Sequence, residues 1–306
     1  MNLIICYTPL QVVVAEKIIS LYPQEKFYGV MIHAVNNKKF DFYADRLKKK
    51  CSLFSSFEQH ITRYDLLKDI IILKHQFKNF KFDKVFAASI NDIKVQFLLS
   101  SINFDEFYSF DDGTANITKS SFYYVDNSKP IRKLANFILG NKYNTNKLKS
   151  ISKAHYTIYP HFPNIIQNTI FIDLFKSATQ NSASSEQVVN ILLGQPVYLD
   201  NQQNIDLAER VIKQFNIDYY LPHPREQYKL ENVKYIDTPL IFEDYMAQHF
   251  SNQKCRVYTY FSSAVLNIHN QNIEPIALRI DTDNPAFIEC YDLLAKSQVK
   301  IIDIRE

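Results

Sequence analysis

The sequence predicts an α/β protein of two doubly wound, Rossmann-like domains that face one another across a cleft. The chain has 306 residues, which is long for one domain and natural for two. Short β-rich apolar runs alternate with helical patterns in both halves, as in parallel sheets covered by helices. The stretch 176–187 lacks large apolar residues and predicts a linker or long surface loop. We therefore expect domains at 1–180 and 181–306.

Composition narrows the possible functions. Hydrophobic residues make up 46% and charged residues 22% of the chain, as in ordinary globular proteins with a sizeable core. The net charge of +3 is too small to indicate nucleic-acid binding. The chain has four glycines and neither a G-x-G-x-x-G motif nor a Walker-type loop, so the usual signatures of NAD binding and P-loop phosphoryl transfer are missing.

The cysteines and the N-terminus favour a cytoplasmic protein. The four cysteines lie far apart in the sequence without metal-ligand spacing, which favours reduced and mostly buried thiols. The opening MNLIICYTPL lacks the basic segment and cleavage site of a signal peptide and reads as a strand. No apolar run reaches the length of a membrane span.

The first domain is predicted from its opening unit. Residues 2–6 form a β-rich apolar run. Thr8, Pro9 and Gln11 then have the pattern of an N-cap, a first helical proline and a closed capping box, and the helix continues over 10–20. A strand that feeds a helix N-terminus opens a doubly wound domain. Further strands are expected at 28–34, 84–89 and 106–110, with helices at 39–50, 64–79 and 91–101.

The second domain repeats the alternation. Residues 203–215 form a clear amphipathic helix, because Ile205, Ala208, Val211 and Phe215 fall on one stripe. Strands are expected at 188–193, 217–221, 233–236, 256–260, 274–279 and 299–304. Parallel-sheet domains bind ligands at the carboxyl ends of their strands, so the residues that follow each strand are the candidates for a site.

Two adjacent carboxylates follow the strand expected at 106–110. Asp111, Asp112 and Gly113 come directly after Phe110. At the carboxyl edge of a sheet they are placed to act as a base or a ligand. The alternative is an Asp-Asp-Gly turn that caps the next segment, since Asp and Gly are routine turn residues.

A histidine follows the strand at 217–221. Pro222 and Pro224 bracket His223 and restrict its backbone, so the imidazole is held where it can donate to an anion. Arg225 adds a permanent positive charge suited to phosphate or carboxylate. The alternative is a rigid surface turn with a solvated histidine.

Hydroxyl and acidic residues follow other strands of the second domain. Ser262 and Ser263 close the strand at 256–260 and open a helix, which suits a phosphate site or an ordinary serine N-cap. Glu243 is placed either to accept from ribose hydroxyls or to begin a helix. Gly194 and Gln195 end the first strand of this domain.

Two further acidic positions complete the set. Asp200 lies just beyond Gln195 and puts another carboxylate near the expected cleft. The D-x-D triplet Asp281-Thr282-Asp283 adjoins Asn284-Pro285, which favours a polar turn over a metal site. Carboxylates, a histidine, an arginine and a phosphate-binding turn at the ends of strands suit group transfer from a nucleotide sugar.

The sequence resembles glycosyltransferase family 52, the bacterial lipooligosaccharide sialyltransferases, over its full length. The resemblance rests on CYTPLQV, FDDGTANI, ILLGQPV, YYLPHPRE, IFEDY and YTYFSSA, in this order. It implies a GT-B architecture, CMP-sialic acid as donor, a galactose-ended glycan as acceptor, inversion at the anomeric carbon, and no metal or cofactor.

The resemblance also implies roles for residues. His223 is the general acid at the departing phosphate, Ser262 and Ser263 bind that phosphate, and Glu243 holds the ribose. The general base is either Asp200 or the pair Asp111 and Asp112. The matching motifs mark further substrate-binding positions: Thr8, Gln11, Gly113, Gly194, Gln195, Pro224 and Arg225.

The family implies a homodimer, and one segment suggests a membrane contact. Residues 132–149 mix basic residues with apolar ones, which predicts either a basic amphipathic helix on an anionic membrane or a partner-facing or core helix. The protein is then cytoplasmic, or peripheral on the inner membrane. Two alternatives stay open: a transferase of another nucleotide-linked sugar, and a non-catalytic CMP-binding protein.

Overall fold

The computed structural model describes residues 1–33, 37–58, 63–124, 139–175, 187–223 and 226–305. The chain folds into two compact units, Met1–Ile172 and Asp173–Glu306. The boundary predicted from the sequence, at residue 180, lies outside the described residues, as does nearly all of the predicted linker. Each unit is built on its own parallel sheet, and each is described by itself below.

The first unit has a seven-stranded sheet in the order β3-β2-β1-β4-β5-β6-β7, with every neighbouring pair parallel. The strands are β1 Asn2–Cys6, β2 Phe27–His33, β3 Leu53–Glu58, β4 Lys81–Ala87, β5 Asn103–Phe110, β6 Ser152–Thr157 and β7 Thr169–Phe171. Every residue of β1 and β2 is buried, as expected of central strands covered on both faces. The strand order reverses between β1 and β4. In doubly wound sheets, ligands bind beside the carboxyl ends of the two strands at such a reversal.

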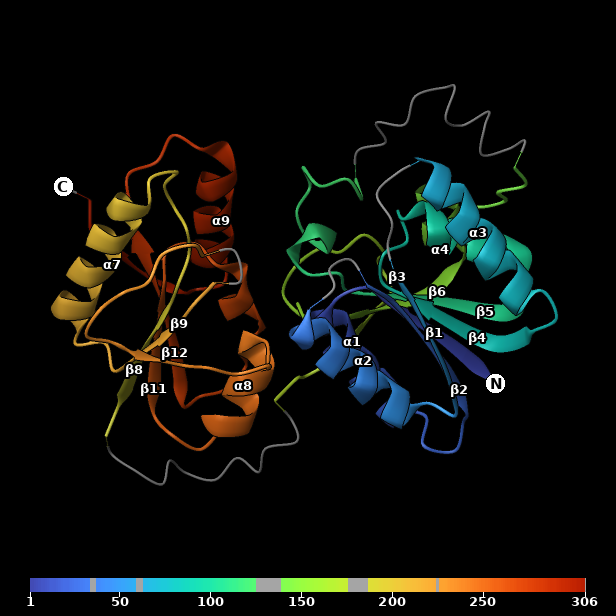
Figure 1. The fold of residues 1–306 in the computed structure, drawn as a ribbon, viewed down its shortest axis with the longest axis horizontal. Helices are drawn as coiled ribbons and strands as arrows, with labels where there is room; N and C mark the ends of the chain where they lie inside the picture. Colours follow the sequence, from blue (N-terminus) through green and yellow to red (C-terminus); the bar gives the residue numbers. More distant parts are fainter. Residues whose placement is uncertain (34–36, 59–62, 125–138, 176–186, 224–225, 306) are drawn as a thin grey trace. The chain divides into compact units, whose positions relative to one another are not determined.

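Helices cover both faces of this sheet. They are α1 Pro9–Ser20, α2 Lys38–Lys50, α3 Arg63–Phe77, α4 Ile93–Ser101 and α6 Thr145–Ile151, with a 3₁₀ turn, η1, at Thr114–Asn116. The pair α1 and α2 packs on one face, and the pair α3 and α4 packs on the other (Figure 1). The core beneath them is aliphatic and aromatic, with Phe77, Phe82 and Phe107 almost fully buried.

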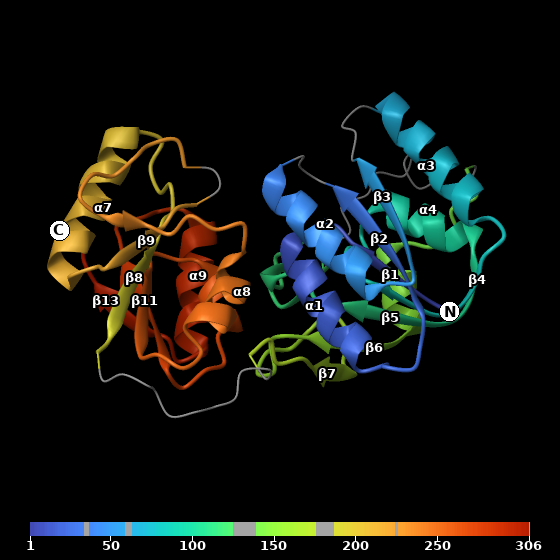
Figure 2. The same ribbon diagram turned by 60° about the horizontal axis from the view of Figure 1, so that its bottom comes forward.

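The second unit has a six-stranded parallel sheet in the order β10-β9-β8-β11-β12-β13. Its strands are β8 Val189–Leu193, β9 Tyr219–Leu221, β10 Lys234–Tyr235, β11 Cys255–Thr259, β12 Ile273–Arg279 and β13 Lys300–Asp303. Helix α7, Asn201–Phe215, covers one face, whereas α8, Phe242–His249, and α9, Pro285–Lys296, cover the other (Figure 2). The strand order reverses between β8 and β11, and the 3₁₀ helix η2, Ser263–Asn267, follows β11.

These two sheets confirm the predicted class, α/β with two doubly wound domains. Apart from the helix expected within 132–149, the strands and helices expected from the sequence are present within a few residues of their predicted bounds. Strands β3, β6 and β7 and helix α9 were not predicted. Strand β3 is largely exposed or half-buried, so its pattern is weak. The triplet Asp281-Thr282-Asp283, interpreted as a polar turn, lies in neither a helix nor a strand, and the adjoining Asn284 and Pro285 are the N-cap and first residue of α9.

The segment 132–149 differs from its prediction over its described part. Residues 132–138 lie outside the described residues. From residue 139 the chain runs through a turn around Gly140, and α6 begins only at Thr145, where the Asn144 side chain caps it. A single amphipathic helix through 149 is therefore wrong for the described half. Of the helices within the described residues, none is long and apolar enough to cross a bilayer.

Candidate functional site

In the first unit, polar side chains that follow β1, β4 and β5 gather around Asp112. Gln11, from the first turn of α1, donates through Nε2 to Asp112 Oδ1. The Tyr123 hydroxyl donates to Asp112 Oδ2 at 2.9 Å, and Ser89 Oγ donates to the same oxygen at 3.3 Å. The carboxyl ends of three neighbouring strands thus hold one carboxylate by three donors.

Burial raises the pKa of Asp112, and the nearby Asp111 carboxyl raises it further. The hydrogen bonds from Tyr123, Gln11 and Ser89 lower this pKa but do not cancel the effect of burial. Asp112 is only partly buried. It therefore has an oriented carboxylate that is more basic than that of an ordinary aspartate, as a general base requires.

Asp111 has a different environment, although it is the adjacent residue. Its side chain is fully buried. Oδ1 bonds with His155 Nε2 at 2.8 Å and accepts from Asn164 Nδ2 at 3.2 Å, while Oδ2 accepts from Thr157 Oγ1 and from the Ile158 N–H, both at 2.7 Å. These contacts join β5 to β6 and the loop that follows β6. Asp111 therefore anchors the backbone that presents Asp112.

The other predicted positions in this unit shape the site. Thr8 Oγ1 caps α1 by accepting from the Gln11 N–H at 3.3 Å. Gln11 Oε1 accepts from the Tyr7 N–H at 2.7 Å, one residue before the partner that a capping box would use. Gly113 has a φ of 97°, a conformation that favours glycine, and it turns the chain after Asp112.

In the second unit, the predicted residues follow three adjacent strands, β9, β8 and β11. Gln195, just after β8, uses Oε1 to accept from Thr259 Oγ1 at 2.8 Å and from the N–H groups of Tyr260 and Phe261, both at 3.1 Å. One amide oxygen therefore holds the turn that leads into Ser262. Gln195 is a half-buried residue that shapes the phosphate-binding candidate.

Ser262 and Ser263 lie at the start of η2 and are partly exposed. Ser262 Oγ caps η2 by accepting from the Ala264 N–H at 3.3 Å. The hydroxyls and backbone N–H groups at such a start suit an anion. Glu243, in the first turn of α8, is 6% exposed and accepts from Asn267 Nδ2 in η2 at 2.7 Å. That contact ties α8 to η2.

His223 lies two residues beyond β9 and is half-buried. Its carbonyl oxygen accepts from the Glu226 N–H at 2.9 Å, and its own N–H donates to Glu226 Oε2 at 3.3 Å. Pro224 and Arg225 lie outside the described residues. The backbone N–H of Gly194 donates to the Leu221 carbonyl at 2.8 Å, so the end of β8 lies against the start of the His223 turn.

Asp200 is placed differently from the other acids. It is exposed, and its carboxylate caps α7 by accepting from the Gln203 N–H at 2.9 Å. An aspartate at an N-cap stabilises a helix in any protein. This contact accounts for Asp200 without a role in chemistry.

A sequence comparison assigns the chain to a family. The pattern that defines glycosyltransferase family 52 matches residues 24–282. The chain belongs to glycosyltransferase family 52. This confirms the family indicated by the six sequence motifs.

Two characterised relatives are similar to this glycosyltransferase over nearly all of its length. One is the CMP-N-acetylneuraminate:beta-galactoside alpha-2,3-sialyltransferase of Pasteurella multocida (strain Pm70), 55% identical over 100% of both chains. The other is the N-acetyllactosaminide alpha-2,3-sialyltransferase of Haemophilus influenzae (strain ATCC 51907 / DSM 11121 / KW20 / Rd), 39% identical over 95% of this chain and 96% of the relative.

Among solved structures, S. aureus MnaA in its UDP co-structure has a TM-score of 0.51 and 11% sequence identity, covering 94% of this chain and 82% of that one. At this identity the likeness concerns the fold alone. It agrees with the GT-B type of two Rossmann-like domains.

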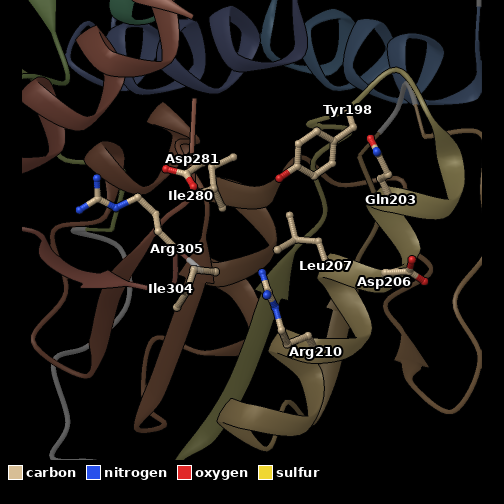
Figure 3. Close-up of a pocket in the computed structure, with 9 residues that line it drawn as sticks. All are labelled: Tyr198, Gln203, Asp206, Leu207, Arg210, Ile280, Asp281, Ile304 and Arg305. Atoms are coloured by element: carbon tan, nitrogen blue, oxygen red, sulfur yellow. The ribbon is translucent and has the colours of Figure 1, made fainter. Parts of the chain in front are cut away.

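The glycosyltransferase also has a pocket of about 410 Å³ in the second unit. It lies between the first half of α7 and the residues that follow β12 and β13. The Tyr198 hydroxyl and the Arg210 guanidinium both point into it, past the apolar side chains of Leu207 and Ile280 (Figure 3). None of the residues to which the family resemblance gives a role lines this pocket, although Asp281 of the D-x-D triplet does. In the described ranges, no group of three or more His, Cys, Asp and Glu side chains is arranged to hold a metal ion.

The sequence motifs missed Ser89, Tyr123 and Glu226. Ser89 is the last residue of the strand predicted at 84–89, and Tyr123 belongs to none of the motifs; the fold brings both to Asp112. Glu226 ends the segment YYLPHPRE, so its closeness to His223 was the available signal.

The contrast between the two aspartates leads to a prediction about stability. An amide at position 111 would present N–H groups to a ring of donors, one of them the fixed Ile158 N–H. We expect Asp111→Asn to lower the free energy of unfolding by about 2 kcal/mol or more. Asp112→Asn is the matched control, because the Tyr123 and Ser89 hydroxyls can rotate to accept, and its stability should stay within about 1 kcal/mol of wild type. Urea unfolding followed by circular dichroism measures both, and equal losses would contradict the distinction.

Proposed function

We propose that the protein is an inverting sialyltransferase. It moves N-acetylneuraminic acid from CMP-sialic acid to a terminal galactose of lipooligosaccharide or a related glycan, in α2,3 linkage, without a metal ion. The observation that carries the proposal is the 55% identity, over the whole of both chains, to a sialyltransferase whose name gives CMP-N-acetylneuraminate as donor and a β-galactoside as acceptor. The second relative, at 39% identity, has the same linkage in its name.

The proposed chemistry needs a base at one end of the displacement. The acceptor hydroxyl attacks the anomeric carbon of sialic acid, and its proton passes to a carboxylate as the new C–O bond forms. We assign this role to Asp112. Its partial exposure, its raised pKa and its three donors support the assignment. Full burial disfavours Asp111, and helix capping accounts for Asp200.

The other end of the displacement needs groups that stabilise a leaving phosphate. As the bond from the anomeric carbon to the phosphate oxygen breaks, CMP gains negative charge, which a carboxylate would repel. We assign His223 to donate a proton there, and Ser262 and Ser263 to bind the phosphate through hydroxyl and N–H groups. Glu243 accepts from the ribose in this scheme. Gly194 and Gln195 shape these turns, and Pro224 and Arg225 stay predictions from the motif.

In this assignment the two units divide the work. The first unit serves the acceptor, because it contains Asp112, and the second binds the donor, because it contains His223 and both serines. Thr8, Gln11 and Gly113 then act through Asp112. Gln11 is fully buried, which supports a positioning role for it over direct contact with a substrate.

The activity is tested by incubating the protein with CMP-sialic acid and lactose in EDTA. We expect CMP release and α2,3-sialyllactose, and a set of β-galactosides without any product would refute the proposal. His223→Ala should lower kcat about 10²- to 10⁴-fold, the usual contribution of a general acid. His161→Ala is the matched control, because His161 is exposed and lies in the other unit. Unchanged turnover in His223→Ala would remove the residue from the mechanism.

The environment of Asp112 predicts a pH effect. Tyr123→Phe removes a donor that stabilises the ionised carboxylate, so the already raised pKa of Asp112 should rise further. Because the base must be ionised, the acid limb of the kcat/KM profile should move to higher pH, with activity recovered above that limb. Tyr124→Phe is the control, since the Tyr124 hydroxyl donates to the Asn116 carbonyl. An acid limb that stays in place would show that Asp112 does not control it.

We further propose that the enzyme is a homodimer on the cytoplasmic side, in peripheral contact with the inner membrane through 132–149. The exposed Leu139, beside the exposed Lys142 and Lys147, supports the contact. The protein should co-sediment with vesicles containing anionic lipid and not with neutral ones, and the binding should weaken as salt screens the charges. Lys142→Glu/Lys147→Glu should reduce it. Equal binding to both vesicle types would contradict the electrostatic contact, and sedimentation velocity tests the dimer.

A further inference from the structure

The turn that carries His223 is closed from both sides by one residue, Glu226. The backbone N–H of Glu226 donates to the His223 carbonyl at 2.9 Å. In return, the backbone N–H of His223 donates to Glu226 Oε2 at 3.3 Å. The second bond matches one half of a capping box, in which the side chain of the fourth residue accepts from the backbone N–H of the first; the return bond here goes to a backbone carbonyl instead.

The same carboxylate oxygen anchors the turn to the sheet. Tyr220 lies in β9 and is fully buried, and its hydroxyl donates to Glu226 Oε2 at 2.6 Å. Glu226 Oε2 therefore accepts from the sheet and from the His223 backbone at once. The two prolines restrict backbone angles within the turn, but restriction alone does not attach the turn to the rest of the fold. Glu226 makes that attachment.

The end of β8 provides the space for this arrangement. A Cβ atom on Gly194 would lie 2.6 Å from Glu226 Oε2 and would also overlap the Tyr220 hydroxyl. A side chain at position 194 would displace the pair. Glycine is therefore needed at position 194, because only a residue without a side chain leaves room for the Glu226 carboxylate.

We propose that Glu226 is the positioning residue of His223. The Tyr220 hydroxyl holds the Glu226 carboxylate by a hydrogen bond, and Gly194 leaves the space that this carboxylate occupies. The inference rests on the proposed function, in which His223 protonates the leaving phosphate. Glu226 touches neither donor nor acceptor in this scheme. It acts through the oxygen that accepts from the His223 N–H. The length of the side chain therefore determines the position of His223, and its negative charge does not. A shift of about 1 Å in a catalytic group is enough to cost about 100-fold in rate.

Reach and charge are separated by two substitutions. Glu226→Gln keeps the length and a carbonyl oxygen, and Glu226→Asp keeps the charge but is one methylene too short for the His223 N–H. We expect kcat to stay within about threefold of wild type in Glu226→Gln and to fall about 10- to 100-fold in Glu226→Asp. The KM for CMP-sialic acid should change little in both. Glu231→Asp is the control, because Glu231 is exposed nearby.

A second readout does not need activity. Hydrogen exchange of the His223 amide should be slow in wild type and in Glu226→Gln, and faster in Glu226→Asp. Wild-type kcat in Glu226→Asp, or equal loss of kcat in both variants, would overturn the inference. A loss of kcat matched by a rise in KM and a lower Tm would also overturn it, as a merely structural role. An inactive wild-type protein would instead refute the proposed function, and amide exchange would still decide whether Glu226 holds the turn.

Discussion

The second unit depends on a close approach at the end of β8. Gly194 has no side chain, so the Tyr220–Glu226 pair can lie against the strand and hold the His223 turn. The next residue, Gln195, gathers three donors from the turn before Ser262. Because β8 lies between β9 and β11, two adjacent residues set the geometry of both neighbouring turns. The groups assigned to the leaving phosphate, His223 and the two serines, are thus both positioned by residues at the end of β8.

The first unit solves a different problem, which is to keep a carboxylate both oriented and basic. Asp111 and Asp112 share a backbone and differ in what surrounds them. Four hydrogen bonds to a fully buried carboxylate make Asp111 a structural anchor. Asp112 has three donors and partial exposure, and burial still raises its pKa. The two adjacent carboxylates therefore differ in burial and in hydrogen-bond partners, although they share one stretch of backbone.

The sequence predicted the fold class, the succession of most strands and helices along the chain, and the family. These could be predicted because apolar periodicity and strand-end motifs are local features of a sequence. It did not predict β3 or β6, whose half-exposed or polar residues hide the strand pattern. In β6, His155 and Thr157 are buried polar residues whose side chains bond to Asp111. Nor did it separate Asp111 from Asp112, since burial and donors come from distant segments. Tyr123 and Ser89 reach Asp112 through the fold alone.

The bond from Gln11 to Asp112 spans 101 residues of chain. Strand β1 lies inside its sheet, where it pairs with the nearby β2 on one side and with the distant β4 on the other, Leu3 lying opposite Val85. Such non-local pairing slows folding. Gln11 Oε1 has a local partner in the Tyr7 N–H, whereas Gln11 Nε2 meets Ser89 and Asp112 only when β1, β4 and β5 have come together. Until these strands have paired, part of the apolar surface of β1 and α1 stays exposed, and partly folded chains with such surface are prone to aggregation.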